Sequence, residues 1–431
     1  MTRYPELNRV GLLAEIGNAR EIYTSGCAAE IVALPDLLSD ALPDASITNI
    51  LSPLINRRSY ASPVSGRRAR TFFLNREVKL HMSAGVIDLC PWSYQQIIHW
   101  LKDVVKMDVA IIMVSPPDAN GWVSIGVQGD FFPLFRNRIG KIIAVVNPQM
   151  PTTRSQFQIA LSEFDAVFSY DQPLLSPPAD VGDVDPMVEI IAGNVANLIP
   201  DGATIQLGLG KISQAVARTL VDHRNLGVLS GLVDDNILHI EGKGVLDKSR
   251  PIVAGAAIGS VEMYEALHDN PRFRFTTSEE THGFASLVNA ESYHSINSTL
   301  QVDLFGQINS ELVNGRLIST PGGFTDTLRG AYMNPKGRAI VTLRARGGTK
   351  TAPGIVAHLS SPSMVSSSKS DADAVVSEFG VAELRNLSMD QRAHALIAIA
   401  APEDRARLSN EWDAFHAGNR TGPARIGADV K

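Results

Sequence analysis

Short runs of apolar residues, rich in valine and isoleucine, recur along the chain between turn-forming segments. Two of them, residues 108–114 and 141–146, are uninterrupted, which is typical of strands buried on both faces of a parallel sheet. Residues 187–199 instead show a helical pattern, which ends at a proline-containing turn. Three further short runs predict strands in the second half of the chain, at residues 203–207, 339–343 and 374–377.

A polar, proline-rich stretch at residues 174–186 shows neither a helical nor a strand pattern. It predicts the connection between two halves of the chain. Short strands alternate with helices on both sides of it, which predicts α/β layers with mainly parallel sheets. A chain of 431 residues is long enough for two such domains. We therefore expect an N-terminal domain over residues 1–180, a C-terminal domain over 187–415 and a tail over 416–431.

The composition excludes several classes of function. Apolar residues make up 44% of the chain and charged residues 19%, as in globular proteins. No run approaches the roughly 18 apolar residues that a membrane span needs, and no apolar export signal precedes the first charges, so we expect a cytoplasmic protein. The net charge of −6 offers no basic surface for nucleic acid. Two cysteines, Cys27 and Cys90, are too few for a disulfide framework, and no residues show metal-ligand spacing.

A glycine-containing segment at residues 208–212, Gly-Leu-Gly-Lys-Ile, follows a predicted strand and opens a predicted helix. Glycines let the backbone approach a ligand closely, and a helix N-terminus offers free N–H groups to an anion. The segment lacks the third glycine of a dinucleotide fingerprint and the ending of a P-loop, so neither NAD nor ATP is indicated. A tight strand-to-helix turn would give the same pattern, and both interpretations stay open at this point.

Longer motifs carry a resemblance to a known family. Residues 115–126 read Ser-Pro-Pro-Asp-Ala-Asn-Gly-Trp-Val-Ser-Ile-Gly, and further motifs lie at 295–307, 322–331 and 375–384. From about residue 80 to residue 405 the chain resembles the acetyl-CoA hydrolase/transferase family, which are family I CoA-transferases of the 4-hydroxybutyrate CoA-transferase type. The resemblance implies two α/β domains of CoA-transferase type with acyl-CoA bound between them. It also implies a homodimer or homotetramer, and coenzyme A as a substrate with no resident cofactor.

The resemblance also implies roles for particular residues. In that family a glutamate carboxylate is the covalent nucleophile that passes CoA from an acyl-CoA to a small carboxylate such as acetate. The glutamate falls at position 231, where this chain has glycine. The residues implied to bind CoA are Gly208, Leu209, Gly210, Lys211, Ile212, Gly322 and Gly323.

Other positions near the expected site also depart from the family. Phe324 stands where a glutamine is usual, and Arg344 and Arg346 stand where uncharged residues are usual. The two arginines suggest a carboxylate or phosphate on the substrate, unless they are surface charges. Scaffold motifs are kept while these positions are changed, which indicates an altered reaction or an altered acyl group. We expect Asp234 or Asp235 to cap the following helix, and Glu378 to be structural.

Three functions remain open, and an enzyme that transfers CoA between an acyl-CoA and a carboxylate is the leading one. Transfer needs another nucleophile, and Glu279 and Glu280 are the candidates unless they are surface acids. Acyl-CoA hydrolysis, of the thioester or of a β-keto carbon–carbon bond, would place water beside Gly231, with His282 or Glu280 as general base. A non-catalytic acyl-CoA-binding protein would also keep the binding loops and lack the nucleophile.

Overall fold

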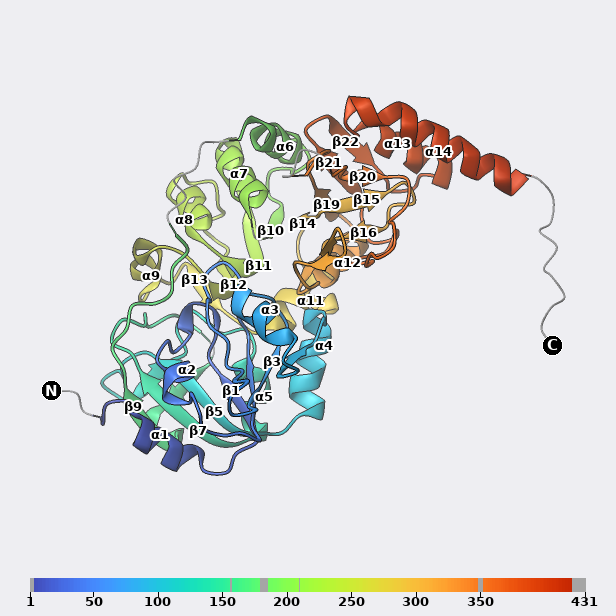
Figure 1. Ribbon diagram of the computed structural model, residues 1–431. Coiled ribbons are helices and arrows are strands. Elements are labelled where there is room, and N and C mark those ends of the chain that lie inside the picture. The colour runs from blue at the N-terminus through green and yellow to red at the C-terminus, as the bar shows by residue number, and fades with distance from the viewer. Residues whose placement is uncertain (1–3, 156, 179–184, 209, 348–351, 421–431) are drawn as a thin grey trace, which may run out of the picture.

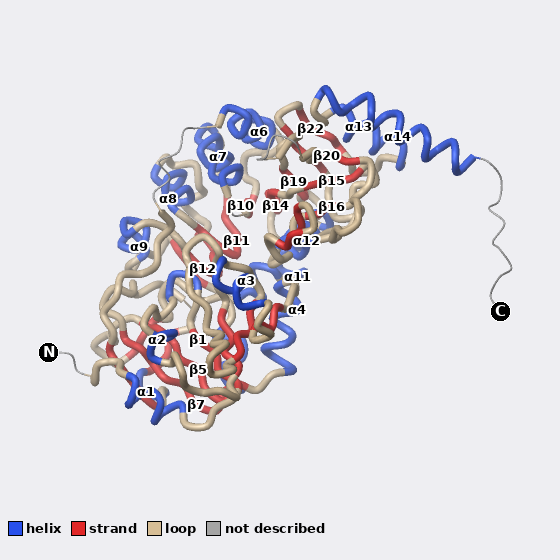
Figure 2. The backbone as a smooth tube through the Cα atoms, in the orientation of Figure 1, coloured by secondary structure: helices blue, strands red, loops and turns tan. Residues whose placement is uncertain are grey.

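A computed structural model of the chain contains two α/β halves that lie against each other (Figure 1). It describes residues 4–155, 157–178, 185–208, 210–347 and 352–420. Strands occupy the middle of each half and helices the outside, so that α6, α7, α8 and α9 follow one outer flank of the second half (Figure 2). No helix in this part of the chain is both long and apolar enough to cross a membrane.

Among the described residues, the first half is built on a seven-stranded parallel sheet in the order β4-β3-β2-β1-β5-β7-β9. Two long neighbouring strands of this sheet, β5 and β7, contain the two apolar runs. The strands of this half are β1 (Glu21–Thr24), β2 (Ser46–Asn49), β3 (Arg68–Thr71), β4 (Ile87–Leu89), β5 (Met107–Val114), β6 (Trp122–Ser124), β7 (Ile139–Val146), β8 (Gln158–Ala160) and β9 (Ala166–Ser169). The helices are α1 (Arg9–Ile16), α2 (Leu34–Leu37), α3 (Arg76–Met82), α4 (Tyr94–His99) and α5 (Phe132–Phe135).

The described part of the second half is built on a similar sheet of eight strands, in the order β13-β12-β11-β10-β14-β19-β21-β22. All pairs in this sheet are parallel except β21 with β22. The strands of the sheet are β10 (Thr204–Leu207), β11 (Gly227–Val233), β12 (Ile252–Ala257), β13 (Phe273–Phe275), β14 (Tyr293–Ser298), β19 (Arg338–Thr342), β21 (Ala374–Ser377) and β22 (Gly380–Glu383). Smaller sheets contain β15 (Gln301–Asp303), β16 (Ile308–Asn309), β17 (Leu312–Val313), β18 (Arg316–Leu317) and β20 (Ile355–Val356).

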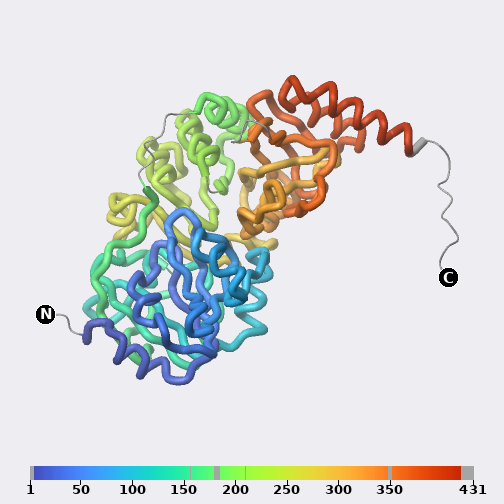
Figure 3. The backbone as a smooth tube through the Cα atoms, in the orientation of Figure 1, coloured from blue at the N-terminus to red at the C-terminus, as the bar shows by residue number. Residues whose placement is uncertain are grey.

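The helices of the second half cover its large sheet and end in a long C-terminal helix. They are α6 (Pro186–Ala196), α7 (Lys211–Thr219), α8 (Asp235–Gly242), α9 (Val261–Leu267), α10 (Ser278–His282), α11 (Phe284–Asn289), α12 (Phe324–Met333), α13 (Met389–Ala398) and α14 (Pro402–Arg420). After β9 the chain follows the flank of the molecule (Figure 3), and the Tyr264 hydroxyl of α9 donates a hydrogen bond to the Leu175 carbonyl (2.6 Å). Part of the predicted connection, residues 179–184, lies outside the described residues.

The predicted fold class is confirmed, and the five predicted strands are present within one or two residues of their expected ends. The prediction of a loose tail from residue 416 is wrong for its first residues, because α14 continues to Arg420. Aromatic side chains explain the longer helix, since Trp412 is buried and stacks on Phe415, one turn away (5.4 Å between ring centroids). Residues 421–431 lie outside the described residues.

The strand order reverses at one place in each sheet. In the first sheet β1 lies between β2 and β5, and in the second β10 lies between β11 and β14. Open parallel sheets bind ligands at the carboxyl ends of their strands, where the order reverses. The carboxyl ends of β1 and β10 lead to Cys27 and Gly208, and both residues line the cavity between the halves.

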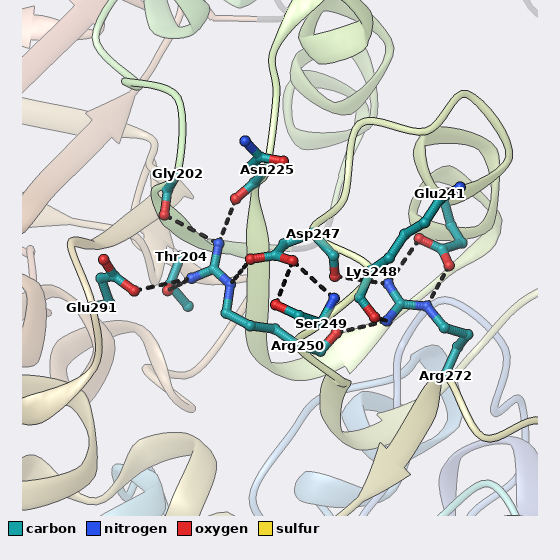
Figure 4. A network of polar contacts seen from close by, with 10 residues as sticks. All are labelled: Gly202, Thr204, Asn225, Glu241, Asp247, Lys248, Ser249, Arg250, Arg272 and Glu291. Atoms are coloured by element: carbon teal, nitrogen blue, oxygen red, sulfur yellow. Dashed lines mark hydrogen bonds and ion pairs between the residues drawn. The ribbon is translucent and has the colours of Figure 1, made fainter.

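The amino ends of the strands in the second sheet are instead fixed by two arginines (Figure 4). Arg250 donates to the carbonyl of Gly202 (3.2 Å) and pairs with the carboxylate of Asp247 (3.1 Å). Arg272 binds both carboxylate oxygens of Glu241 (2.6 and 3.2 Å) and three backbone carbonyls. These contacts hold the loops at the edge opposite the cavity, so this network is structural.

Candidate active site

A cavity of about 340 Å³ lies between the two halves of the molecule. Loops at the carboxyl ends of both sheets form its walls, as the strand order predicts. The residues that matter for its chemistry are Cys27, Phe73, Tyr94 and Asp130 from the first half and Gly208, Gly231, His282, Asn297, Gly322, Gly323 and Phe324 from the second.

Gly231 lies on β11, and its missing side chain leaves room for the ring of His282. A Cβ added to Gly231 would lie 2.3 Å from His282 Cε1 and 3.0 Å from Nε2. A Cβ added to Gly323 would lie 2.2 Å from the same Nε2 atom. Separations this short do not occur between real atoms, so the imidazole fills the space into which a side chain at position 231 would project. Both glycines are required by this close approach.

The His282 ring is buried at the end of α10, with only 5% of the residue exposed. Loss of solvent lowers its pKa to about 3, so the imidazole is neutral at physiological pH. Its Nδ1 atom lies 2.9 Å from the Thr281 hydroxyl, and its ring centroid lies 4.1 Å from that of Tyr94. A base this weak accepts few protons near neutral pH, so His282 is better suited to hydrogen bonding than to general base catalysis.

The motif at residues 115–126 forms a tight turn in the first half. Asp118 Oδ1 accepts hydrogen bonds from the backbone N–H groups of Asn120 (2.8 Å) and Trp122 (2.9 Å). Gly121 has φ of +82°, a conformation that favours glycine. The turn leads into residues 127–129, which run beside β12 of the second half, with Gly129 N–H donating to the Gly255 carbonyl (2.9 Å). The turn and residues 127–129 therefore position the residue that follows them, Asp130, in the wall of the cavity.

Asp130 is a buried carboxyl beside the strand that carries Gly231. A Cβ placed on Gly255 of β12 would lie 3.3 Å from Asp130 Cβ and 2.9 Å from the Gly231 carbonyl oxygen. Asp130 and Gly231 therefore both lie next to Gly255. Burial raises the pKa of Asp130 to about 7, although backbone hydrogen bonds, including one from Phe131 N–H (3.0 Å), lower it. In the described part of the chain, Asp130 is the only carboxylate that lines this cavity.

The glycine loop lines the cavity from the side of the second half. Gly208 and Gly210 are lining residues, as are Gly322 and Gly323, whereas Leu209 lies outside the described residues. A Cβ on Gly208 would lie 2.8 Å from Asn297 Oδ1, which explains the need for glycine. Lys211 and Ile212 form the first turn of α7 beside the loop and are not lining residues.

Comparison with known proteins identifies the family. The sequence pattern of the acetyl-CoA hydrolase/transferase N-terminal domain matches residues 24–176, and that of the C-terminal domain matches residues 259–412. The 4-hydroxybutyrate coenzyme A transferase of Clostridium kluyveri is 33% identical over 339 residues, which cover 77% of this chain and 78% of that protein. The chain belongs to the acetyl-CoA hydrolase/transferase family. It is accordingly an enzyme of CoA-transferase or acyl-CoA hydrolase type, as the sequence predicted.

Two further relatives support the membership in the acetyl-CoA hydrolase/transferase family. The succinyl-CoA:cyclohexane-1-carboxylate CoA transferase of Geobacter metallireducens is 31% identical, over 79% of each chain. The crystal structure of RipA from Yersinia pestis superposes with a TM-score of 0.85 at 26% identity, over 96% of this chain and 98% of that one. The two-domain α/β architecture is therefore shared along almost the whole chain.

Glu279 and Glu280, the candidate nucleophiles for CoA transfer in this family member, do not line the cavity. Glu279 forms an ion pair with Lys102 of the first half, at the surface. Glu280 accepts hydrogen bonds from the guanidinium of Arg274 (2.5 and 2.9 Å) and the hydroxyl of Thr276 (2.6 Å). The Arg274 guanidinium lowers the pKa of Glu280. The structure thus brings His282 to the site and leaves both glutamates outside it.

The other charged residues that the sequence singled out have partners away from the cavity. The predicted helix-capping aspartate is Asp234, at the N-terminus of α8. Glu378 accepts from the backbone, as its expected structural role requires, and the two arginines are held in ion pairs. These contacts join Asp234 to the Asn236 N–H (3.0 Å), Glu378 to the Ala345 N–H (2.9 Å), Arg344 to Asp185, and Arg346 to Glu403 (2.8 Å) and Asp404 (2.9 Å).

The sequence analysis missed Asp130, because a single aspartate does not show from the sequence alone whether it is buried in a cavity or exposed. One signal was available, since Asp130 stands between Gly129 and two phenylalanines, in a stretch too apolar for an exposed acid. In the described part of the chain, no group of three or more His, Cys, Asp and Glu side chains could hold a metal ion.

Proposed function

We propose that this member of the acetyl-CoA hydrolase/transferase family hydrolyses the thioester of an acyl-CoA. One observation carries the proposal: the neutral ring of His282 fills the space beside Gly231 and Gly323, where the resemblance places the nucleophilic glutamate. Transfer of CoA by this family's route requires a carboxylate there, first to form an acyl anhydride and then a thioester with CoA. Hydrolysis requires only water, a base and a donor for the developing oxyanion.

In the proposed reaction, Asp130 is the general base. Its carboxylate takes a proton from a water molecule whose oxygen attacks the thioester carbonyl carbon. The tetrahedral intermediate collapses, the carbon–sulfur bond breaks, and the CoA thiolate takes the proton from Asp130. A pKa of about 7 suits this role, because the carboxyl then both accepts and returns a proton near neutral pH.

His282 acts in the proposed reaction as a hydrogen-bond donor. When its Nδ1 atom accepts the hydrogen of the Thr281 hydroxyl, the only N–H group of the ring is at Nε2, next to Gly323. A neutral imidazole in this tautomer can donate to the oxyanion of the tetrahedral intermediate without carrying a charge of its own. Burial keeps the ring neutral and thereby maintains that role.

CoA transfer is the second candidate, with Asp130 itself as the covalent nucleophile. The observation that favours it is the position of Asp130, whose side chain lies beside the stretch of β11 that carries Gly231. The Asp130 carboxylate would attack the thioester in place of the family's glutamate, and a small carboxylate would later take the CoA. This route needs an acceptor, which separates it from hydrolysis.

The test is mass spectrometry of the purified protein with a panel of acyl-CoAs, with and without acetate or succinate. Free CoA released without an acceptor supports hydrolysis. A new acyl-CoA that forms only when the acceptor is present contradicts it and supports transfer. If CoA raises the melting temperature and no acyl-CoA is consumed, the protein only binds its ligand. Asp130→Asn should reduce turnover by about 10²-fold or more, and Glu279→Gln, which changes a surface ion pair, is the matched control.

A further inference from the structure

The cavity wall beside His282 is built from aromatic rings of both halves. Phe73 and Tyr94 meet edge to face, with 6.1 Å between their ring centroids, and Tyr94 lies 4.1 Å from His282. Gly322 joins the halves here, because its carbonyl accepts from Tyr94 N–H (3.2 Å) and a Cβ on it would lie 2.9 Å from Phe73 Cε1. Phe324, where the resemblance places a glutamine, also lines the cavity.

The same wall offers nothing that would neutralise a negatively charged acyl group. No lysine or arginine lines the cavity in the described part of the chain. The two arginines that suggested an anionic substrate, Arg344 and Arg346, pair with acids elsewhere. A carboxylate at the end of the acyl group would therefore lose water and face Asp130 without a counter-ion. Acyl groups derived from dicarboxylic acids are disfavoured for this reason.

We propose that the site takes acyl-CoA thioesters whose acyl group carries an uncharged aromatic ring. This inference rests on the proposed function, since it names the substrate of the same site. A flat ring presents its edge or face to Phe73, Tyr94 and Phe324, which are the arrangements that aromatic pairs prefer. An acetyl group is too small to cover three aromatic rings and would leave much of this apolar surface in contact with water. Phe324 adds apolar wall where a glutamine would offer an amide.

Two measurements test the substrate class. The first compares kcat/KM for CoA release from benzoyl-CoA, phenylacetyl-CoA, acetyl-CoA and succinyl-CoA. We expect the two aromatic thioesters to exceed the other two by at least about tenfold. Phe324→Gln should lower the ratio of the benzoyl-CoA value to the acetyl-CoA value, and an unchanged ratio would overturn the aromatic site. Phe379→Gln, which alters a phenylalanine that is 43% exposed and outside the cavity, is the matched control.

The second measurement does not depend on turnover and uses the thioethers S-benzyl-CoA, S-ethyl-CoA and S-carboxymethyl-CoA. Calorimetry should show that S-benzyl-CoA binds at least about tenfold more tightly than the other two. A benzyl preference without hydrolysis of any thioester upholds the aromatic site and overturns the proposed function. Hydrolysis with acetyl- or succinyl-CoA as the better substrate, or equal binding of the three thioethers, overturns the aromatic site.

Discussion

Gly231 should tolerate no side chain while His282 keeps its ring. A Cβ at position 231 would lie 2.3 Å from His282 Cε1, whereas ordinary contacts begin near 3.4 Å. Gly231→Ala therefore forces the ring to move by about 1 Å in a close-packed, buried place. The backbone of Gly323 also lies close to the ring, since a Cβ built there would lie 2.2 Å from Nε2, so the ring has little room to yield.

The expected cost follows from the size of this overlap. Overpacking a buried site destabilises a protein by about 1–3 kcal/mol, and each kcal/mol lowers the melting temperature of a domain this size by about 2–4 °C. His282→Ala removes the ring and so the overlap. In that background Gly231→Ala should be neutral or slightly stabilising, because glycine in a strand costs about 0.5–1 kcal/mol relative to alanine.

Melting temperatures of the wild type, the two single variants and the double variant measure the coupling between the two positions. Gly193→Ala is the control, because a Cβ at this helical glycine meets nothing within 4 Å. The reasoning is refuted if Gly231→Ala melts like the wild type, or if it costs as much in the His282→Ala background as in the native one. Either result would mean that the imidazole does not fill the space beside residue 231.

Three further predictions concern the carboxylates. Asp130→Asn should reduce CoA release by about 10²-fold or more, and wild-type kcat/KM should fall as pH decreases through about 7, the pKa of Asp130; a flat profile would remove it from the mechanism. The same residue should affect stability: its folded pKa lies above the model-peptide value of 3.8, so its contribution to stability is present at low pH and lost as pH rises through about 7. Asp130→Asn should therefore stabilise the protein more at pH 8 than at pH 5, by up to about 3 kcal/mol, because stability is lost at about 1.4 kcal/mol per pH unit between pH 5 and 7. An equal change in melting temperature at both pH values would refute the assignment. Glu279→Gln and Glu280→Gln should leave CoA release unchanged, and loss of turnover in either would return that residue to the reaction.

The strands could be predicted from sequence because their signal is local. Within residues 108–114 and 141–146, every residue after the first is apolar, and only a strand covered on both faces suits such a run. The site could be predicted only in part, because it depends on contacts between distant segments. Gly231 reads as a lost nucleophile, and nothing in its neighbourhood shows that a ring from α10 takes the vacant space.

The three candidates in residues 279–282 show why spacing in the sequence was insufficient. Successive residues of a helix point about 100° apart, so neighbours in a short helix face different surroundings. His282 points into the cavity, while Glu279 pairs with Lys102 at the surface and Glu280 pairs with Arg274. Which face of α10 would be buried was decided by the packing of the two halves.

The most direct test of the account is a single turnover in H₂¹⁸O, with enzyme in excess over benzoyl-CoA, followed by mass spectrometry of acid and protein. Direct attack by water, activated by Asp130, predicts one ¹⁸O atom in the released acid and none in the tryptic peptide of residues 107–136. Unlabelled acid together with ¹⁸O in that peptide would contradict the account, because it would show that the Asp130 carboxylate is the covalent nucleophile.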